Sequence, residues 1–273
     1  MSAAAQPPLF EIAPGERPLL ISMPHSGTFV PPDLAARLSR AALDLPDTDW
    51  HVPKLYDFAG AIGASVLCAT HSRYVVDLNR PPDAALLYPG RRETGVCPLE
   101  TFDGEPLYAQ ADAPAQAEIG TRLARYWRPY HAQLRAMLDA LVSRHGGCLL
   151  LDAHSIRSFV PELFAGRLPD LNVGTADGRS CAAGTAQRVV SRLSAQRRFT
   201  FVVDGRFKGG YITRHYGNPA ARVEAVQLEI AQCAYLLEAR VPSFDAARAA
   251  PLGVLLRELL TDLAELRGAE ARG

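Results

Sequence analysis

The chain has 273 residues, with 29 basic and 29 acidic side chains and therefore no net charge at pH 7. Proteins that hold nucleic acid or an anionic membrane through bulk charge carry a positive excess, so this balance argues against both kinds of partner. With 48% hydrophobic and 21% charged residues the chain has the composition of a folded protein, and its length suits a single domain over residues 1–273.

Five cysteines form an odd number with no CxxC pair, which predicts free thiols in a reducing compartment and no disulfide framework. The N-terminal residues lack the basic start and apolar run of a secretion signal, and no apolar run reaches the ~18 residues of a membrane span. We therefore expect a cytoplasmic protein with no membrane association. The sequence leaves its oligomeric state open.

The hydrophobic pattern predicts strands that alternate with helices along the chain. The expected strands cover residues 18–23, 64–69, 73–78, 148–151, 171–173, 199–203 and 225–230. The expected helices cover residues 33–42, 47–59, 115–144, 181–195 and 252–266. Pro129 should kink the third of these helices. Several strands are apolar throughout, which is typical of a sheet covered on both faces, so the sequence predicts an α/β fold.

A long segment between the second and third expected helices, residues 83–110, is rich in Pro, Gly and Asp and has few periodic apolar positions. It predicts a partly ordered loop, and loops of this length are often functional or act as lids. Whether it closes over a substrate is left open.

Two histidines follow apolar strands of the predicted sheet, and each is followed by a serine. They are His25, after residues 18–23, and His154, after residues 148–151. Catalytic zinc takes three protein ligands, often two histidines and a carboxylate, and leaves one position for water. Asp49 is our first choice for the carboxylate and Asp47 the alternative, as a helix cap if not a ligand. Taken singly, either histidine is better explained as a hydrogen-bonded core residue, and it is the pair that favours a metal site.

Acid–base and substrate-binding candidates follow other strands. Glu229 lies within the apolar run AVQLEI, where burial would raise the pKa of its carboxyl group towards the range of a general base. The alternative is a strand-edge glutamate that faces water. Arg73 and Arg80 bracket the segment RYVVDLNR, and their guanidinium groups suit an acidic small-molecule substrate, with Asn79 as a neutral donor.

With these residues in view, the sequence resembles the N-formylglutamate amidohydrolases, the deformylases of bacterial histidine degradation. The resemblance spans residues 18–236 and nine ordered blocks. These are SMPHSG at 22–27, DTDWHV at 47–52, SRYVVDLNRPPD at 72–83, LYPGRRETG at 87–95, YWRPYH at 126–131, LDAHSIRS at 151–158, LPDLNVGT at 168–175, FKGGYITRHYG at 207–217 and AVQLEIAQCAYL at 225–236.

The resemblance implies a three-layer α/β/α sandwich with a mixed central sheet, similar to the zinc carboxypeptidases. It implies metal-dependent hydrolysis of N-formyl-L-glutamate to formate and L-glutamate, the last step of a histidine degradation route, with zinc as the first choice of divalent metal. His25 and His154 would bind the metal, with Asp49 as the third ligand inferred from the residues, and Glu229 and Arg73 would be catalytic. The expected substrate-binding residues are Asn79, Arg80, Arg157, Gly210, Tyr211 and Arg214. The zinc carboxypeptidase-like proteins take their second metal ligand from a glutamate three residues after the first histidine, where this chain has Thr28.

Other functions compete with this interpretation. The same site could hydrolyse another N-acyl amino acid or a peptide terminus. A metal-free binding protein for acidic amino acids would use the arginines alone and leave the histidine pair without a role. An arginine-driven nucleic-acid binder is disfavoured by the zero net charge.

Overall fold

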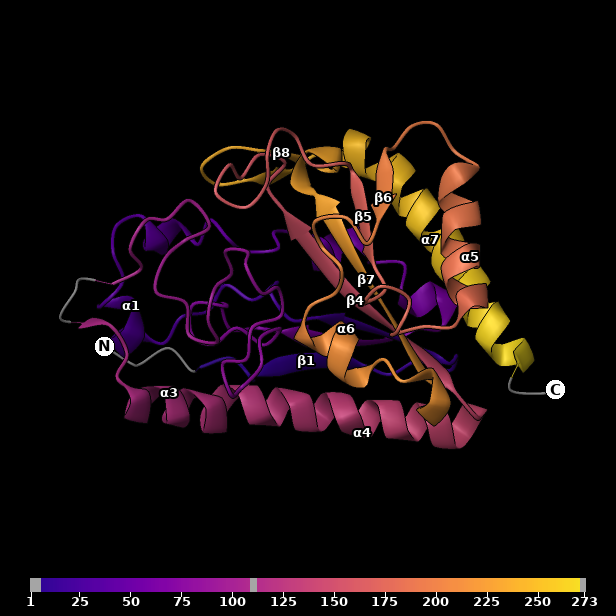
Figure 1. Ribbon diagram of the computed structural model, residues 1–273, viewed down its shortest axis with the longest axis horizontal. Coiled ribbons are helices and arrows are strands. Elements are labelled where there is room, and N and C mark those ends of the chain that lie inside the picture. Colours follow the sequence, from indigo (N-terminus) through magenta and orange to yellow (C-terminus); the bar gives the residue numbers. More distant parts are fainter. Residues whose placement is uncertain (1–5, 109–111, 271–273) are drawn as a thin grey trace.

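A seven-stranded mixed sheet runs through the centre of the molecule, with helices packed on both faces (Figure 1). The protein is represented by a computed structural model, which describes residues 6–108 and 112–270. The strands are β1 (Phe10–Ala13), β2 (Leu19–Met23), β3 (Ser65–Ala69), β4 (Cys148–Ile156), β5 (Leu171–Gly174), β6 (Phe201–Val203), β7 (Val223–Ala231), β8 (Leu236–Leu237) and β9 (Ser243–Phe244). The helices are α1 (Pro32–Ala35), α2 (Val52–Leu55), α3 (Gln116–Arg122), α4 (Arg128–His145), α5 (Ala183–Ser194), α6 (Tyr211–Tyr216) and α7 (Ala246–Glu270).

The strand order in the main sheet is β1-β3-β2-β4-β7-β5-β6. The four central strands β3, β2, β4 and β7 are parallel to one another, whereas β1 pairs with β3 and β5 pairs with β7 in the antiparallel sense. Parallel strands bring their carboxyl ends to one edge of the sheet, which is where ligands bind in open α/β folds. The sheet therefore has a defined edge for a site.

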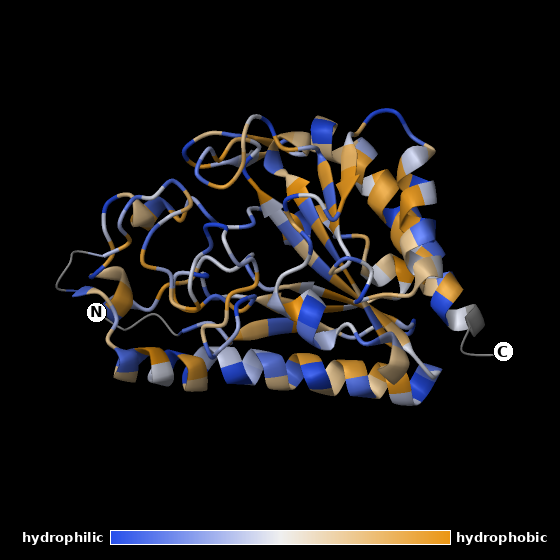
Figure 2. Ribbon diagram, viewed as in Figure 1, coloured by the Kyte–Doolittle hydropathy of each residue, from blue (hydrophilic) through white to orange (hydrophobic). Residues whose placement is uncertain are grey.

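Side chains alternate between two apolar layers along the central strands. Leu149 and Leu151 of β4 pack in the layer that contains α5 and α7, whereas Leu150 packs in the layer that contains α4. Figure 2 shows these strands as largely hydrophobic, as expected for strands buried on both faces. The predicted three-layer α/β/α sandwich with a mixed sheet is confirmed. Within the described part of the chain, no helix is both long and apolar enough to cross a membrane.

The expected strand at residues 73–78 is wrong, because this segment forms consecutive turns. The Ser72 hydroxyl accepts a hydrogen bond from the Tyr74 backbone N–H at 3.2 Å, and the Val75 N–H bonds back to the Ser72 carbonyl at 2.9 Å. Serine side chains stabilise turns in this way. Residues 73–78 include an apolar run because this turn is buried beside the site, and not because they form a strand of the sheet.

The two early helices are also much shorter than predicted. Residues 33–42 and 47–59 and their flanks form the short helices α1 and α2, with 3₁₀ turns at Ala42–Asp44 and Gly60–Ile62. His51 adopts a left-handed conformation with φ of 59°, so the backbone cannot continue as a helix from Asp47. Asp47 is consequently no helix cap. Its Oδ2 accepts hydrogen bonds from the Tyr74 hydroxyl and the Phe102 N–H.

The long helix keeps its course past Pro129 (Figure 1). A π-helical turn at Leu123–Trp127 joins α3 to α4, and the Arg128 N–H bonds to the Leu123 carbonyl. This wider turn accommodates the proline, which has no N–H to donate, in place of the predicted kink. β4 is longer than predicted, because residues 152–156 pair with residues 227–231 of β7. β1, α6 and the small β8–β9 hairpin were not predicted.

The helical layer formed by α7 gives a test of the packing. Leu256 is fully buried against the sheet, whereas Val254, two residues earlier on the same helix, is 58% exposed. We expect Leu256→Ala to lower the free energy of unfolding by about 2–5 kcal/mol, because it leaves a cavity. We expect Val254→Ala to change it by less than about 0.5 kcal/mol. Denaturant unfolding measures both, and equal losses would contradict the described packing.

Candidate active site

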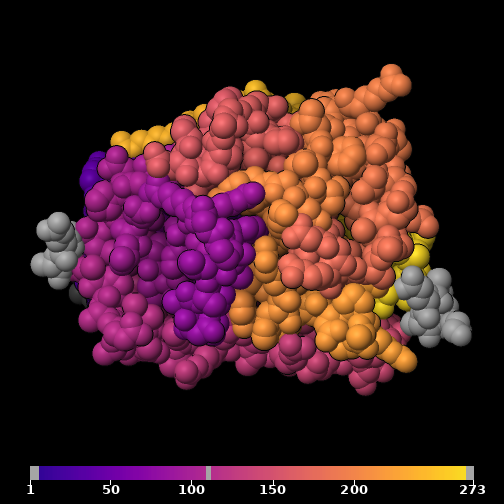
Figure 3. Space-filling view, in the orientation of Figure 1, coloured from indigo at the N-terminus to yellow at the C-terminus, as the bar shows by residue number. Residues whose placement is uncertain are grey.

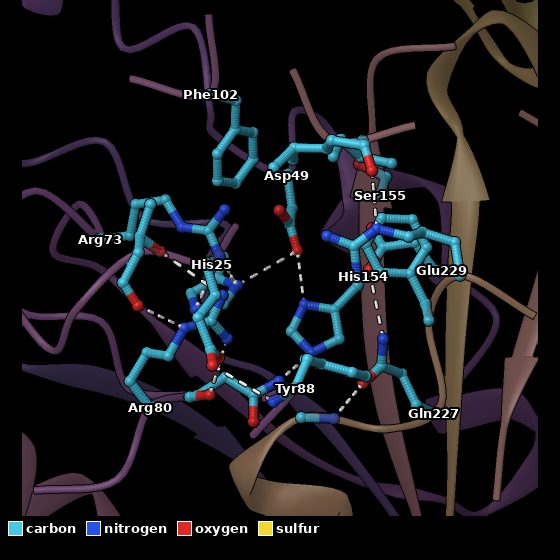
Figure 4. Close-up of a pocket in the computed structure, with 18 of the residues that line it drawn as sticks. His25, Asp49, Arg73, Arg80, Tyr88, Phe102, His154, Ser155, Gln227 and Glu229 are labelled. Carbon is cyan, nitrogen blue, oxygen red and sulfur yellow. Dashed lines mark hydrogen bonds and ion pairs between the residues drawn. The ribbon is translucent and has the colours of Figure 1, made fainter. Parts of the chain in front are cut away.

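The candidate site lies at the carboxyl edge of the parallel strands. His25 follows β2, His154 lies near the end of β4, and Glu229 lies directly opposite His154 in the register of β7. His154 therefore lies inside a strand and not after one, contrary to the expectation from the sequence. Loops supply Asp49 and Arg73 to the same place (Figure 4).

His25, Asp49 and His154 form a possible metal-binding group. Each offers one ligand atom, these atoms lie within 4.8 Å of one another, and all three side chains are buried. Asp49 Oδ2 lies 2.9 Å from His154 Nδ1 and 3.8 Å from His25 Nδ1. Ligand atoms of a tetrahedral zinc site are separated by about 3.3 Å, so the spacing fits such an ion after small adjustments. Asp47, the alternative carboxylate, is outside this group.

Two further carboxylates orient the imidazole rings. Asp77 Oδ1 lies 2.7 Å from His25 Nε2, and Asp152 Oδ1 lies 2.9 Å from His154 Nε2. Both Nδ1 atoms therefore face Asp49 (Figure 4), and each ring is held by a buried acid on its other side. Metal-binding histidines are commonly held in this way, because the hydrogen bond fixes the tautomer that leaves the other nitrogen free. Asp77 was not among the site residues predicted from the sequence.

Charge around His154 favours a cation at this point. Burial alone would lower the pKa of His154, but the hydrogen bonds and charges of Asp152 and Asp49 raise it well above its ordinary value. At His25 the effects of burial and of the neighbouring Arg73 dominate, and the pKa is lowered. The donor set therefore combines an imidazole that is easily deprotonated with a surplus of buried negative charge, which is what binding of a divalent cation requires.

Asn79 and Gly210 close the floor of the site. Asn79 Nδ2 lies 2.8 Å from His154 Nε2 and donates to Asp152 Oδ2 at 3.1 Å, while its Oδ1 accepts from the Ile212 N–H. The backbone of Gly210 lies directly against this amide, and a Cβ atom there would be 2.4 Å from Asn79 Nδ2. Glycine is therefore required at this position for the amide to reach the histidine.

Glu229 is buried beside the metal-binding group. Gln227 Nε2 donates to Glu229 Oε2 at 3.2 Å, and Gln227 is itself fixed by the Gly210 N–H at 2.6 Å. Burial is the main cause that raises the pKa of the Glu229 carboxyl group to about 7. A carboxyl group with such a pKa can accept and return a proton near neutral pH.

Arg73 reaches the site from the turn that follows β3. Its Nη2 lies 2.5 Å from His25 Nδ1, the atom that would bind the metal, and 3.4 Å from Asp77 Oδ2. Its Nη1 donates to the Asp47 carbonyl at 3.2 Å. The charges of Asp77, Asp49 and Asp47 raise the pKa of Arg73 despite its burial, which would lower it. Arg73 is thus held as a permanent cation beside the ligands.

The cavity over these groups is lined by some predicted substrate-binding residues and not by others. Asn79, Arg80 and Gly210 line it. Three lie elsewhere: Arg157 pairs with Asp103 at 2.8 Å, Tyr211 stacks on His215, and Arg214 donates to the Gly209 carbonyl. Their side chains are engaged outside the lining, so a role in substrate binding stays a prediction for them.

Several lining residues were not predicted as site residues. The loop of residues 83–110 contributes Tyr88, Arg92, Glu93, Thr94 and Phe102, and the segment after β6 contributes Arg206 and Phe207. For the residues of this loop, its unusual length was the one feature of the sequence that pointed to a place in the site. Figure 3 shows this purple loop against the orange segment near residues 205–215, where the Tyr88 hydroxyl donates to the Gly209 carbonyl at 2.9 Å.

A mixed α/β sheet that collects a possible metal group and a buried glutamate at its strand ends is the architecture of an amide hydrolase. A family model described as N-formylglutamate amidohydrolase matches residues 17–236, and the chain belongs to this family. The resemblance drawn from the nine sequence blocks is thereby confirmed.

Individual relatives agree with this assignment. The chain is 50% identical over 249 residues to the N-formylglutamate deformylase of Pseudomonas aeruginosa and 48% identical over 249 residues to that of Pseudomonas putida. Each alignment covers 91% of this chain and 93% of the relative. The crystal structure of N-formylglutamate amidohydrolase from Ralstonia eutropha JMP134 superposes with a TM-score of 0.81 at 27% identity, covering 94% of this chain and 97% of that one. The chain is an amidohydrolase.

The orienting acids give a test of the metal group. Asp77→Asn keeps the shape of the side chain but removes the charge that holds His25 Nε2–H, so we expect binding of Zn²⁺ to weaken by about 10- to 100-fold. Asp139→Asn, the same change at an exposed position of α4, should leave the affinity unchanged. Competition with a chromophoric chelator measures both affinities. Unaltered binding by the Asp77 variant would show that this carboxylate does not support a metal ligand.

Proposed function

We propose that this protein hydrolyses N-formyl-L-glutamate to formate and L-glutamate with a divalent metal ion bound by His25, Asp49 and His154. Zn²⁺ is the first choice of metal. The observation that carries the proposal is the buried His–Asp–His group beside Glu229, in a chain of the N-formylglutamate amidohydrolase family. A bound metal ion would act as a Lewis acid that polarises the formyl carbonyl group and lowers the pKa of water.

Glu229 is the group that moves the proton. Its carboxylate takes a proton from the water molecule that attacks the formyl carbon. The C–N bond then breaks, and the same carboxyl group returns the proton to the departing nitrogen, which leaves as the amine of glutamate. The pKa of about 7, raised by burial, suits both transfers in one cycle. The Gln227 amide keeps the carboxyl group aimed at the cavity.

Arg73 supplies positive charge where negative charge develops. As the water attacks, the formyl oxygen gains charge, and a guanidinium group in a buried site stabilises such an oxyanion. Contacts with Asp77 and the Asp47 carbonyl fix the orientation of Arg73 before the substrate arrives. Little reorganisation is then needed during the reaction.

The acyl group and the biological setting are part of the same proposal. Formyl is the smallest acyl group, so a tight pocket would exclude acetyl analogues by steric clash with the added methyl group. The reaction would be the last step of histidine degradation in a bacterial cytoplasm. The five cysteines, all free in the structure, are consistent with a reducing compartment.

The alternative substrate classes are other N-acyl amino acids and peptide termini. A panel of N-formyl-, N-acetyl- and N-succinyl-glutamate with N-formylaspartate and a dipeptide distinguishes them. Highest kcat/KM on any substrate other than N-formyl-L-glutamate would replace the proposed substrate while leaving the site assignment in place.

Metal dependence is tested by formate release. We expect the purified protein to release formate from N-formyl-L-glutamate, to lose this activity on chelation, and to regain it when Zn²⁺ or another divalent ion is added. The reason is that the three ligands supply no Lewis acid of their own. An enzyme that stays fully active after its metal content has been shown to be negligible would contradict the proposed cofactor.

The role of Glu229 is tested by Glu229→Gln, which removes the basic carboxylate and keeps the shape. We expect kcat to fall by about 10²- to 10⁴-fold while metal content stays that of the unaltered enzyme. Glu224→Gln, on the same strand, is the matched control, because Glu224 pairs with Arg267 and does not line the cavity. It should lower stability but not turnover per folded molecule. Near-normal turnover by a folded, metal-loaded Glu229 variant would disprove the base assignment.

A further inference from the structure

Of the four guanidinium groups that line the cavity, two form no ion pair within the described part of the chain. Arg73 pairs with Asp77, and Arg92 pairs with Glu100 and Glu162. Arg80 and Arg206 line the same cavity, but neither forms an ion pair with any carboxylate of the described residues. Charged side chains are usually paired when they are half-buried, so the two unpaired cations require an explanation.

Both guanidinium groups are held by neutral oxygen atoms of one loop. Arg80 Nε donates to the Thr94 carbonyl at 2.8 Å, and Arg206 Nη2 donates to the Arg92 carbonyl at 3.3 Å. Arg206 Nε is also fixed by the Leu163 carbonyl at 2.7 Å. Carbonyl groups two residues apart are separated by at most about 7 Å, so the loop holds the two cations as neighbours.

The surroundings of Arg206 are unfavourable for an isolated cation. Burial lowers the pKa of the Arg206 guanidinium, and the positive charges of Arg91 and Arg80 add to this effect, while Tyr88 and Glu93 oppose it. The Glu93 carboxylate is itself engaged by the backbone N–H groups of residues 87 and 88. A bound anion would relieve this repulsion, and fixed guanidinium groups bind carboxylates through paired hydrogen bonds.

We propose that Arg206 binds the side-chain carboxylate of the substrate while Arg80 binds its α-carboxylate, which makes the enzyme selective for N-formyl derivatives of dicarboxylic amino acids. This inference rests on the proposed function. The α-carboxylate is attached to the carbon that carries the formamide nitrogen, so it must lie nearer to the reacting bond. Arg80 directly follows Asn79, whose amide contacts His154, and it is therefore the cation nearer to the reacting centre. Arg206 comes from the segment after β6 and is left for the second carboxylate.

The test compares two substrates that differ only in this charge. N-formyl-L-glutamine has nearly the shape of N-formyl-L-glutamate but carries an uncharged amide at the end of its side chain. The ratio of the two kcat/KM values is measured for the unaltered enzyme and for Arg206→Gln, Arg206→Lys and Arg91→Gln. This ratio does not depend on the fraction of folded enzyme. Arg91→Gln is the matched control, since it removes the neighbouring exposed charge without touching the cavity lining.

We expect Arg206→Gln to lower kcat/KM for N-formylglutamate by about 10- to 100-fold, mainly through KM, and to change that for N-formylglutamine by less than about threefold. Arg206→Lys should keep a preference for the charged substrate, and Arg91→Gln should keep the original ratio. Equal losses on both substrates in the Arg206→Gln enzyme would overturn the assignment of Arg206. If the unaltered enzyme releases no formate from either substrate, the proposed function fails instead, which separates the two results.

Discussion

The burial of acidic side chains at the ends of parallel strands is the constraint on which the site depends. An ion taken out of water without a partner costs several kcal/mol, so each buried carboxylate must face positive charge or hydrogen-bond donors. Here Asp77 faces His25 and Arg73, Asp152 faces His154, and Asp49 lies between the two rings. The contacts that make this burial tolerable are the same contacts that turn both Nδ1 atoms towards one point. Stability and the geometry of the metal group therefore have a common cause.

The sheet and the loops contribute different parts of this arrangement. The strands fix His154 opposite Glu229 in the register of β4 and β7, and a shift by one residue would turn Glu229 to the other face of the sheet, away from His154. The loops surround this anionic floor with a wall that contains Arg80 and Arg206. A site with a cation-binding floor and an anion-binding wall matches a substrate that has a polar amide to be cleaved and carboxylates to be held. This complementarity links the family assignment to the proposed substrate.

Sequence reasoning found the parts of the fold that local hydrophobicity determines. The fully apolar runs of the central strands and the periodic pattern of α4, α5 and α7 are local signals. The apolar segment at 73–78 has the same signal but is buried in a turn beside the site, so its pattern was misleading. Asp77 and Arg206 were not predicted as site residues, because their positions depend on tertiary contacts with His25 and with the Arg92 carbonyl that have no local sequence pattern. Sequence could not separate Asp49 from Asp47 either, because only the turn around His51 decides which one faces the histidines.

The proposed chemistry depends most on where a metal ion binds and through which atoms. Anomalous diffraction at the zinc absorption edge, from a crystal of the full chain grown with Zn²⁺, tests it most directly. We expect a single strong peak within bonding distance of the Asp49 carboxylate and of Nδ1 of both His25 and His154, with Asp77 and Asp152 still on the opposite ring nitrogens. Absence of a peak among these residues, or ligation through the Nε2 atoms with the orienting acids displaced, would contradict the account.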